Sequence, residues 1–140
     1  MGGATMDFPK SFKGNAPASD SVIQTFEQQS GIKLPDQYVR FLKTMNGGEG
    51  FVGANYLVVF PIEKLIEYNR GYGFDKWVPD LLLFGSNGAG EGFAFDRCHA
   101  AWPVVMVPFV PLEVQNAISV SESFNSLFDS LLKRDLADLI

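Results

Sequence analysis

The most reactive side chains belong to the only cysteine and the only histidine, which are neighbours at Cys98 and His99. A thiol beside an imidazole is the pair that a cysteine nucleophile and its general base would form. Adjacent residues on a strand point to opposite faces, so these two side chains would meet only in a turn. We therefore interpret both as ordinary loop residues and predict that the chain has no catalytic residue and is not an enzyme.

The same residue inventory argues against a dedicated metal site. One histidine and one cysteine cannot by themselves form the four-ligand site that a soft metal such as zinc requires. The carboxylates of the chain do not have the spacing of a calcium-binding loop. We predict no bound metal ion.

The glycine-rich run at residues 85–92, GSNGAGEG, offers backbone amides that resemble a phosphate cradle. Phosphate-binding glycine loops open a helix, and the P-loop adds a lysine followed by serine or threonine. Here a strand pattern follows the run, Glu91 stands inside it, and no lysine is near. Asn87-Gly88 is instead a hairpin signal, so the run predicts two antiparallel strands and no bound cofactor.

A second group of residues lies between Tyr68 and Trp77, where aromatic side chains alternate with charged residues and chain breakers. A loop of this composition offers more aromatic surface than it can readily bury. It either folds back as a lid over one end of the sheet or contacts a protein partner, for which Tyr and Trp are typical anchors. The residues that we predict to bind a partner are Tyr72, Phe74, Asp75, Trp77, Asp80, Glu91 and Asp96.

The charge of the chain is uneven along its length. Eleven basic and sixteen acidic residues give a net charge of −5. Residues 1–70 carry seven of each sign, whereas residues 71–140 carry four basic and nine acidic residues. This excess makes nucleic acid an improbable direct ligand. The acidic half either serves solubility or steers the chain toward a basic protein partner.

A chain of 140 residues is expected to form one domain, because two units would each approach the size at which a core alone rarely suffices. Residues 1–18 are polar and lack a period, so we expect an irregular lead-in to a domain at residues 19–140. The single cysteine excludes an internal disulfide, and the chain has neither an apolar run of eighteen residues nor a stretch resembling a signal peptide. These features predict a cytoplasmic protein that does not span a membrane.

Helices are predicted where apolar residues recur at helical spacing. The range 20–30 has N-cap candidates before it and Gly31 after it, and Pro35 opens a second helix that ends at Asn46-Gly47-Gly48. A short helix begins at Pro61 and stops between Asn69 and Gly71. Residues 119–122 match a capping box and predict a long C-terminal helix with an apolar stripe that continues to Leu139.

Strands are predicted at residues 51–60, 81–85, 91–96 and 104–110. Pro108 limits the last of these to an edge or a break. Together with the helices they predict an α+β fold in a single domain, with a mainly antiparallel sheet, helices packed on one face and a long C-terminal helix.

The order of these motifs resembles the SUKH superfamily, which contains bacterial immunity proteins and fungal regulators of cell-wall synthesis. The resemblance covers roughly residues 22–96. The first motif is Ile23-x-x-Phe26-Glu27 followed by Gly31-x-x-Leu34-Pro35-x-x-Tyr38-x-x-Phe41-Leu42-x-x-x-Asn46-Gly47-Gly48. The second is Phe60-Pro61-Ile62 with Glu67, and the third is Leu83-Phe84-Gly85-Ser86-Asn87-Gly88-x-Gly90 with Phe95-Asp96. The resemblance implies an α+β domain that acts by binding, without catalytic residues. In bacterial members it implies neutralisation of a toxin, often a nuclease or deaminase.

Three functions remain open at this point. The leading one is a cytoplasmic immunity protein that binds and neutralises a cognate, basic, nuclease- or deaminase-type toxin. The alternative is a regulatory or scaffold domain that binds endogenous cell-wall or signalling machinery. The genomic neighbourhood distinguishes the two, because the gene of an immunity protein should lie beside a toxin gene. A small hydrolase or ligand-binding enzyme is the third, supported only by Cys98, His99 and scattered carboxylates. The oligomeric state is not determined by these patterns.

Overall fold

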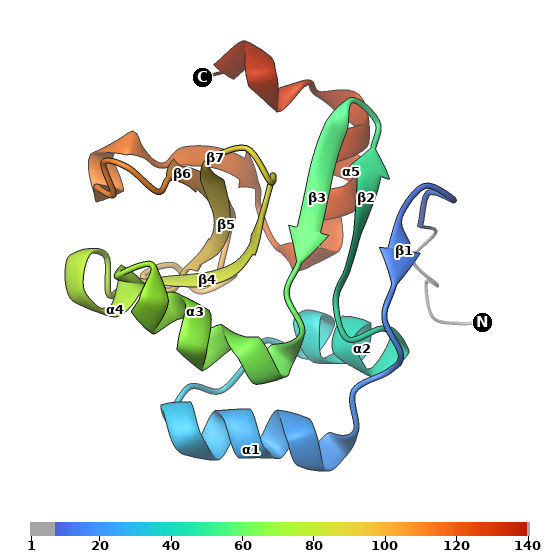
Figure 1. Ribbon diagram of the computed structural model, residues 1–140, viewed down its shortest axis with the longest axis vertical. Coiled ribbons are helices and arrows are strands. Elements are labelled where there is room, and N and C mark those ends of the chain that lie inside the picture. Colours follow the sequence, from blue (N-terminus) through green and yellow to red (C-terminus); the bar gives the residue numbers. More distant parts are fainter. Residues whose placement is uncertain (1–7, 140) are drawn as a thin grey trace.

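The computed structural model describes residues 8–139, which contain a seven-stranded sheet with helices around it (Figure 1). Neighbouring strands follow the order of the chain, and each pair is antiparallel. This confirms the α+β class and the antiparallel sheet. The strands are β1 (Lys13–Gly14), β2 (Gly48–Val52), β3 (Asn55–Val59), β4 (Leu81–Ser86), β5 (Glu91–Asp96), β6 (Val104–Pro108) and β7 (Ile118–Ser121).

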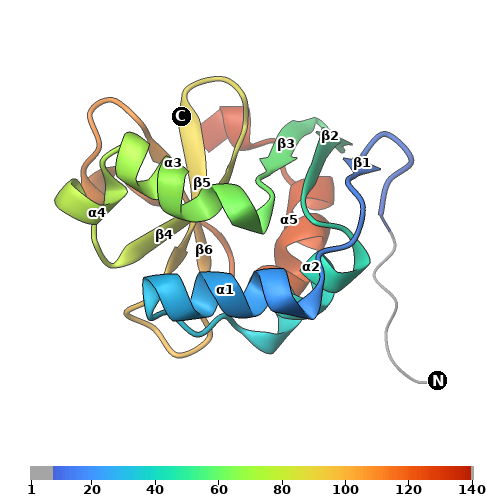
Figure 2. The same cartoon turned by 60° about the horizontal axis from the view of Figure 1, so that its bottom comes forward.

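Five α-helices accompany the sheet in the described residues, and α1 and α3 lie on the same side of β4 (Figure 2). The first helix has the ends that the sequence predicts: Ser19 accepts a hydrogen bond from the amide of Val22, and Gly31 adopts a left-handed φ of 71°. The helices are α1 (Asp20–Ser30), α2 (Asp36–Thr44), α3 (Leu65–Gly71), α4 (Phe74–Trp77) and α5 (Leu127–Lys133). Single 3-10 turns precede α3 and α5 and follow α5.

The range 51–60 was predicted as one strand and is instead part of a hairpin. The chain turns at Gly53, which has a φ of 62°, so that Val52 pairs with Asn55. Apolar residues stand on both sides of this turn, and Gly53-Ala54 is not the Asn-Gly or Asp-Gly pair that marks a two-residue hairpin, so the pattern reads as one strand. Gly53 supplies the positive φ that other residues adopt at a cost.

The C-terminal segment also departs from its prediction. Residues 118–121, which contain most of the proposed capping box, pair with β6 as strand β7. The helix α5 has only seven residues, and a separate 3-10 turn at Leu136–Leu139 follows it. A predicted long helix is therefore a strand, a short helix and a turn, because sheet pairing satisfies the amides that a capping box would otherwise serve.

Residues 8–18, predicted as an irregular lead-in, join the fold. Lys13 and Gly14 pair with β2, and Phe12 and Ala18 are buried. The ring of Phe8 packs against Phe128 with centroids 4.9 Å apart. This segment covers one end of the core.

The core is centred on an aromatic cluster from four parts of the chain. Phe84 of β4 stacks on Phe95 of β5 at 4.4 Å between ring centroids, and Tyr38 of α2 lies 5.1 Å from Phe95. Phe41 of α2 contacts Phe124, which precedes α5, at 4.9 Å. These contacts fasten α2 and the start of α5 to one face of β4 and β5.

The opposite face of β5 is covered as well. A side chain at Gly92 would meet the ring of Phe109, and Phe109 lies 6.3 Å from the buried ring of Phe74 in α4. Because strand neighbours alternate between faces, Gly92 and Phe95 face opposite sides. The sheet is therefore buried on both faces at β4 and β5, where every residue of β4 and the four central residues of β5 are buried.

The pairing of β3 with β4 extends over only two residue pairs, Val58 with Ser86 and Val59 with Gly85. Beyond them, the edge of β4 is completed by a side chain. The amide nitrogen of Asn69 in α3 donates to the carbonyl of Leu83 at 2.9 Å, and its oxygen accepts from the Leu83 amide at 2.8 Å. Asn69 thus takes the place of a strand residue and holds α3 beside β4.

Phe128 is 4% exposed and packs against Phe8, Phe12 and Phe41. Phe128→Ala is expected to lower the free energy of unfolding by about 3–5 kcal/mol, because a buried aromatic ring is lost. Leu132 lies one helical turn further along α5 and is 52% exposed. Leu132→Ala is therefore the control and should lower the free energy of unfolding far less. Chemical denaturation measures both, and equal effects would contradict this orientation of α5.

Tyr38 is fully buried, and its hydroxyl has no hydrogen-bond partner among the described residues. Burial raises the pKa of this hydroxyl, which therefore stays neutral. An unsatisfied buried polar group costs about 1–3 kcal/mol. Tyr38→Phe is thus expected to raise the melting temperature measured by calorimetry, and a clear decrease would show that the hydroxyl does have a partner.

Candidate functional site

The aromatic segment predicted to bind a partner forms the end of α3 and the short helix α4. Trp77 is 64% exposed, with the Lys76 ammonium 4.8 Å from its ring centre, and Tyr72 is 47% exposed and stacks on Phe109 at 4.1 Å. Phe74 is completely buried. The prediction that Phe74 contacts a partner is therefore wrong, because a helical turn directs its ring into the core while Trp77 stays outside.

The predicted carboxylates do not form one group. Asp75 lies on α4, and Asp80 and Asp96 are linked through the backbone: Leu81 pairs with Asp96, and the Arg97 amide donates to the Asp80 carbonyl at 2.9 Å. The carboxylates of Asp75, Asp80 and Asp96 therefore belong to the end of the molecule that carries α4. We define the α4 surface as Tyr72, Asp75, Trp77, Asp80 and Asp96.

Glu91 belongs to another part of the molecule. It stands at the far end of β5 from Asp96, where Asn87 donates a hydrogen bond to its carboxylate at 2.7 Å. Its side chain lines a hollow with Phe51 and Tyr56 rather than facing α4. The predicted set of binding residues is thus divided between two surfaces.

Cys98 and His99 occupy a turn after β5, the one arrangement in which they could act together. Both are instead tied to carboxylates. Nδ1 of His99 lies 2.9 Å from Oδ2 of Asp96, and the hydrogen bond of the Cys98 thiol to Asp80 raises the pKa of that thiol. Because the thiolate is the nucleophile, a raised pKa makes this cysteine less reactive than a free one.

No group of three or more His, Cys, Asp or Glu side chains in residues 8–139 has the arrangement of a metal site. The helices of the same range are all too short or too polar to cross a membrane.

The glycine-rich run is a hairpin loop between β4 and β5, as predicted. Its amides are used within the loop: Gly88 donates to the Ser86 hydroxyl at 2.9 Å, and Ala89 and Glu91 donate to the Asn87 side chain at 2.9 and 3.1 Å. An anion would have to compete with these internal acceptors and with the Glu91 carboxylate. The loop therefore does not present a phosphate cradle.

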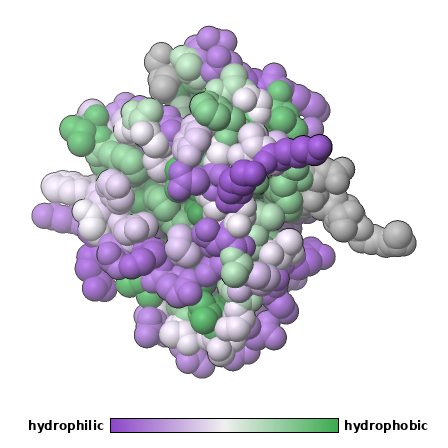
Figure 3. Space-filling view, turned by 45° about the vertical axis from the view of Figure 1, so that its right-hand side comes forward, coloured by the Kyte–Doolittle hydropathy of each residue, from purple (hydrophilic) through white to green (hydrophobic). Residues whose placement is uncertain are grey.

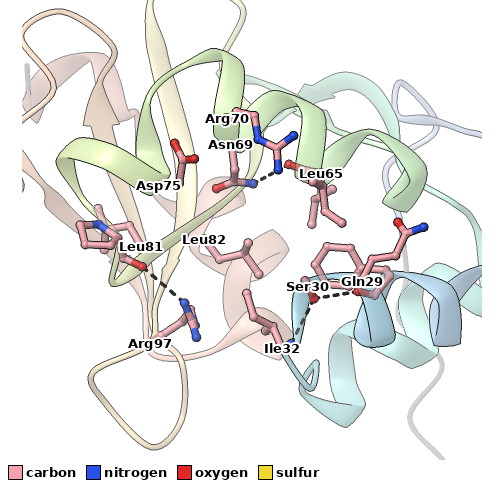
Figure 4. Close-up of a pocket in the computed structure, with 13 residues that line it drawn as sticks. Gln29, Ser30, Ile32, Leu65, Asn69, Arg70, Asp75, Leu81, Leu82 and Arg97 are labelled. Carbon is pink, nitrogen blue, oxygen red and sulfur yellow. Dashed lines mark hydrogen bonds between the residues drawn. The ribbon is translucent and has the colours of Figure 1, made fainter.

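A cleft of about 240 Å³ opens between α1, α3 and β4, next to the α4 surface (Figure 4). Buried Phe26, Leu65 and Leu82 form its apolar part, and the exposed Arg70 and Arg97 line its sides. The two arginines come from different elements, and their spacing in the sequence contains no sign of a shared site. The sequence analysis did not predict this cleft. Basic residues are scarce after residue 70, and no local pattern indicates that Arg97 lies near Arg70.

A second hollow, of about 360 Å³, lies between the tip of the β2–β3 hairpin and the C-terminal turn. Phe51, at 55% exposure, packs edge-on against Tyr56 at its rim. Figure 3 brings the side of β1 and β2 forward and shows apolar residues reaching the surface among hydrophilic ones. In this hollow, as in the cleft, apolar lining meets charged side chains.

Comparison with known proteins finds similarity over most of the chain. A model of the SMI1 / KNR4 family (SUKH-1) matches residues 17–130. The uncharacterized protein YnaB of Bacillus subtilis (strain 168) is 30% identical over 128 residues, which cover 83% of this chain and 77% of the relative. The family match extends the likeness beyond the motif region through β6 and β7 and into the first residues of α5.

From the hairpin structure of residues 85–92, we expect that the chain does not bind nucleotides. Titration with ATP or NAD in a calorimeter is expected to give only heats of dilution, because the amides of Gly88, Ala89 and Glu91 already have acceptors within the loop. Saturable binding at micromolar concentration would contradict this reading of residues 85–92.

Proposed function

The chain belongs to the SMI1 / KNR4 (SUKH-1) family, and from that premise we propose that it is a non-enzymatic immunity protein that binds and neutralises a basic, nuclease- or deaminase-type toxin in the cytoplasm. The observation that carries the proposal is the α4 surface. It combines an aromatic side chain that is 64% exposed, Trp77, with the carboxylates of Asp75 and Asp80 on one short segment.

The two kinds of side chain have different roles in this proposal. Trp77 is a large apolar group that loses its contact with water when a partner covers it, which is how aromatic hot spots contribute. Asp75 and Asp80 attract a basic partner before contact is made, since Coulomb forces act over several ångströms. Tyr72 is held in place by its stack on Phe109, so little side-chain entropy is lost when it binds.

The state of Cys98 supports a binding role over hydrolysis. Its thiol bonds to Asp80, and the raised pKa of the thiol disfavours the nucleophilic form. A regulatory domain that binds an endogenous partner would use the same kind of surface. Co-expression with the product of the neighbouring gene tests the choice, because a toxin should be tolerated by cells only when this chain is present and should copurify with it.

Charge reversal at Asp75 and Asp80 is expected to slow association with the copurified toxin about tenfold at low salt. The wild-type association rate should also fall as salt rises, because screening at physiological ionic strength limits the attraction to about 8 Å. Glu122→Lys, an exposed position outside the α4 surface, is the control and should have a much smaller effect. Surface plasmon resonance measures the rates, and an association rate that is independent of salt and of both carboxylates would refute the steering role.

Trp77→Ala is expected to raise the dissociation rate about tenfold or more, as the loss of a hot spot of about 2 kcal/mol implies. The association rate should change little, since short-range burial acts after encounter. Val114→Ala provides a matched control, because Val114 is similarly exposed at 61% but lies outside the α4 surface. If both variants dissociate at the wild-type rate, Trp77 is not an anchor.

A further inference from the structure

The cleft between α1, α3 and β4 has the opposite charge character from the α4 surface beside it. Figure 4 shows Arg70 and Arg97 on opposite sides of the cleft, with Leu82 between them. In a chain of net charge −5, two guanidinium groups around one apolar floor are a local reversal of sign. Asp75 also lines the cleft, at its border with the α4 surface.

The two arginines have no carboxylate partner in residues 8–139. The ion pairs there join lysines or His99 to acidic residues and do not include Arg70 or Arg97. Arg97 makes one long hydrogen bond of 3.4 Å to the carbonyl of Pro79, and its guanidinium lies 5.9 Å from the Trp102 ring. Most of the donors of both groups are therefore free to bind an anion.

Two of the three uncharged polar side chains that line the cleft, those of Ser30 and Asn69, are already engaged. Asn69 bonds to the backbone of Leu65 and Leu83, and the Ser30 hydroxyl donates to the carbonyl of Phe26 and accepts from the amide of Ile32. A ligand therefore meets the apolar floor, the two guanidinium groups at the sides and the side-chain amide of Gln29. With about 240 Å³, the cleft is smaller than the roughly 300–1,000 Å³ typical of cofactor and drug-sized sites. This size suits a single side chain.

We infer that the cleft receives an acidic–apolar–acidic segment of the partner protein. One apolar side chain enters between Phe26, Leu65 and Leu82, and the flanking carboxylates bind Arg70 and Arg97 by charge-assisted hydrogen bonds. The inference rests on the proposed function in that it supplies a second contact for the same partner. It also specifies that partner: a basic patch facing the α4 surface stands beside an acidic segment that fits the cleft.

Peptide titrations followed by NMR on the full-length, ¹⁵N-labelled chain test this inference without the toxin. The probe is acetyl-Gly-Glu-Leu-Glu-Gly-amide, compared with the same peptide carrying glutamine for both glutamates and with one carrying glycine for leucine. At low ionic strength the acidic leucine peptide is expected to bind about tenfold more tightly than either, with shifts at Leu65, Asn69 and Leu82.

Variants of the arginines and of Asp75 are expected to change the affinity for the acidic peptide in opposite directions. Arg70→Gln and Arg97→Gln should each weaken binding of the acidic peptide several-fold, and the double variant should bind the glutamate and glutamine peptides equally. Arg40→Gln, an exposed arginine on α2 outside the cleft, is the matched control and should bind as the wild type does. Asp75→Asn should tighten peptide binding several-fold while slowing association with a basic toxin.

The inference is overturned if the glutamine peptide binds as tightly as the acidic one, if the arginine variants bind like the wild type, or if the shifts map outside the cleft. Shifts of cleft residues that depend on protein concentration alone would show that a second copy occupies the cleft, which also overturns it. A toxin that binds through the α4 surface while the peptides fail would leave the proposed function standing and remove only this inference.

Discussion

Buried backbone groups must find hydrogen-bond partners, and in this fold asparagine side chains provide them where the chain leaves a strand or helix. Asn69 completes the edge of β4 after β3 has ended, through two bonds to Leu83. Asn46 accepts from the amide of Ile62 at 2.8 Å, and Asn55 accepts from the amide of Leu136 at 2.9 Å while donating to the end of α5. The curved sheet and its helices depend on these substitutes for strand pairing.

The position of α3 determines the character of the functional surfaces. Because Asn69 fixes α3 beside β4, Arg70 lies at the cleft opposite Arg97, and the chain enters α4 with Asp75 and Trp77 outward and Phe74 inward. A cationic cleft and an acidic, aromatic surface therefore adjoin each other, with Asp75 lining the first and belonging to the second. Adjacent surfaces of opposite sign favour one orientation of a partner and disfavour others, which is a route to specificity rather than to affinity alone.

Local signals in the sequence were sufficient where an element is defined by its own ends. Ser19 and Gly31 delimit α1, and Asn87-Gly88 marks the β4–β5 hairpin, because capping and turn chemistry act within a few residues. They failed at residues 118–121, where a capping-box pattern forms strand β7. The pairing with β6 that decides this segment comes from residues more than ten positions earlier, and no local pattern reports it.

The sequence by itself determined the class of fold, the aromatic and acidic composition of the segment from Tyr72 to Asp80, and the family resemblance. These follow from periodicity, turn residues and charge, which are properties of short stretches. Only the tertiary structure decided which side chains share a surface. It buried Phe74, turned Glu91 away from Asp96, and brought Arg70 and Arg97 to one cleft, because strand alternation and helix packing direct side chains in ways that sequence proximity does not.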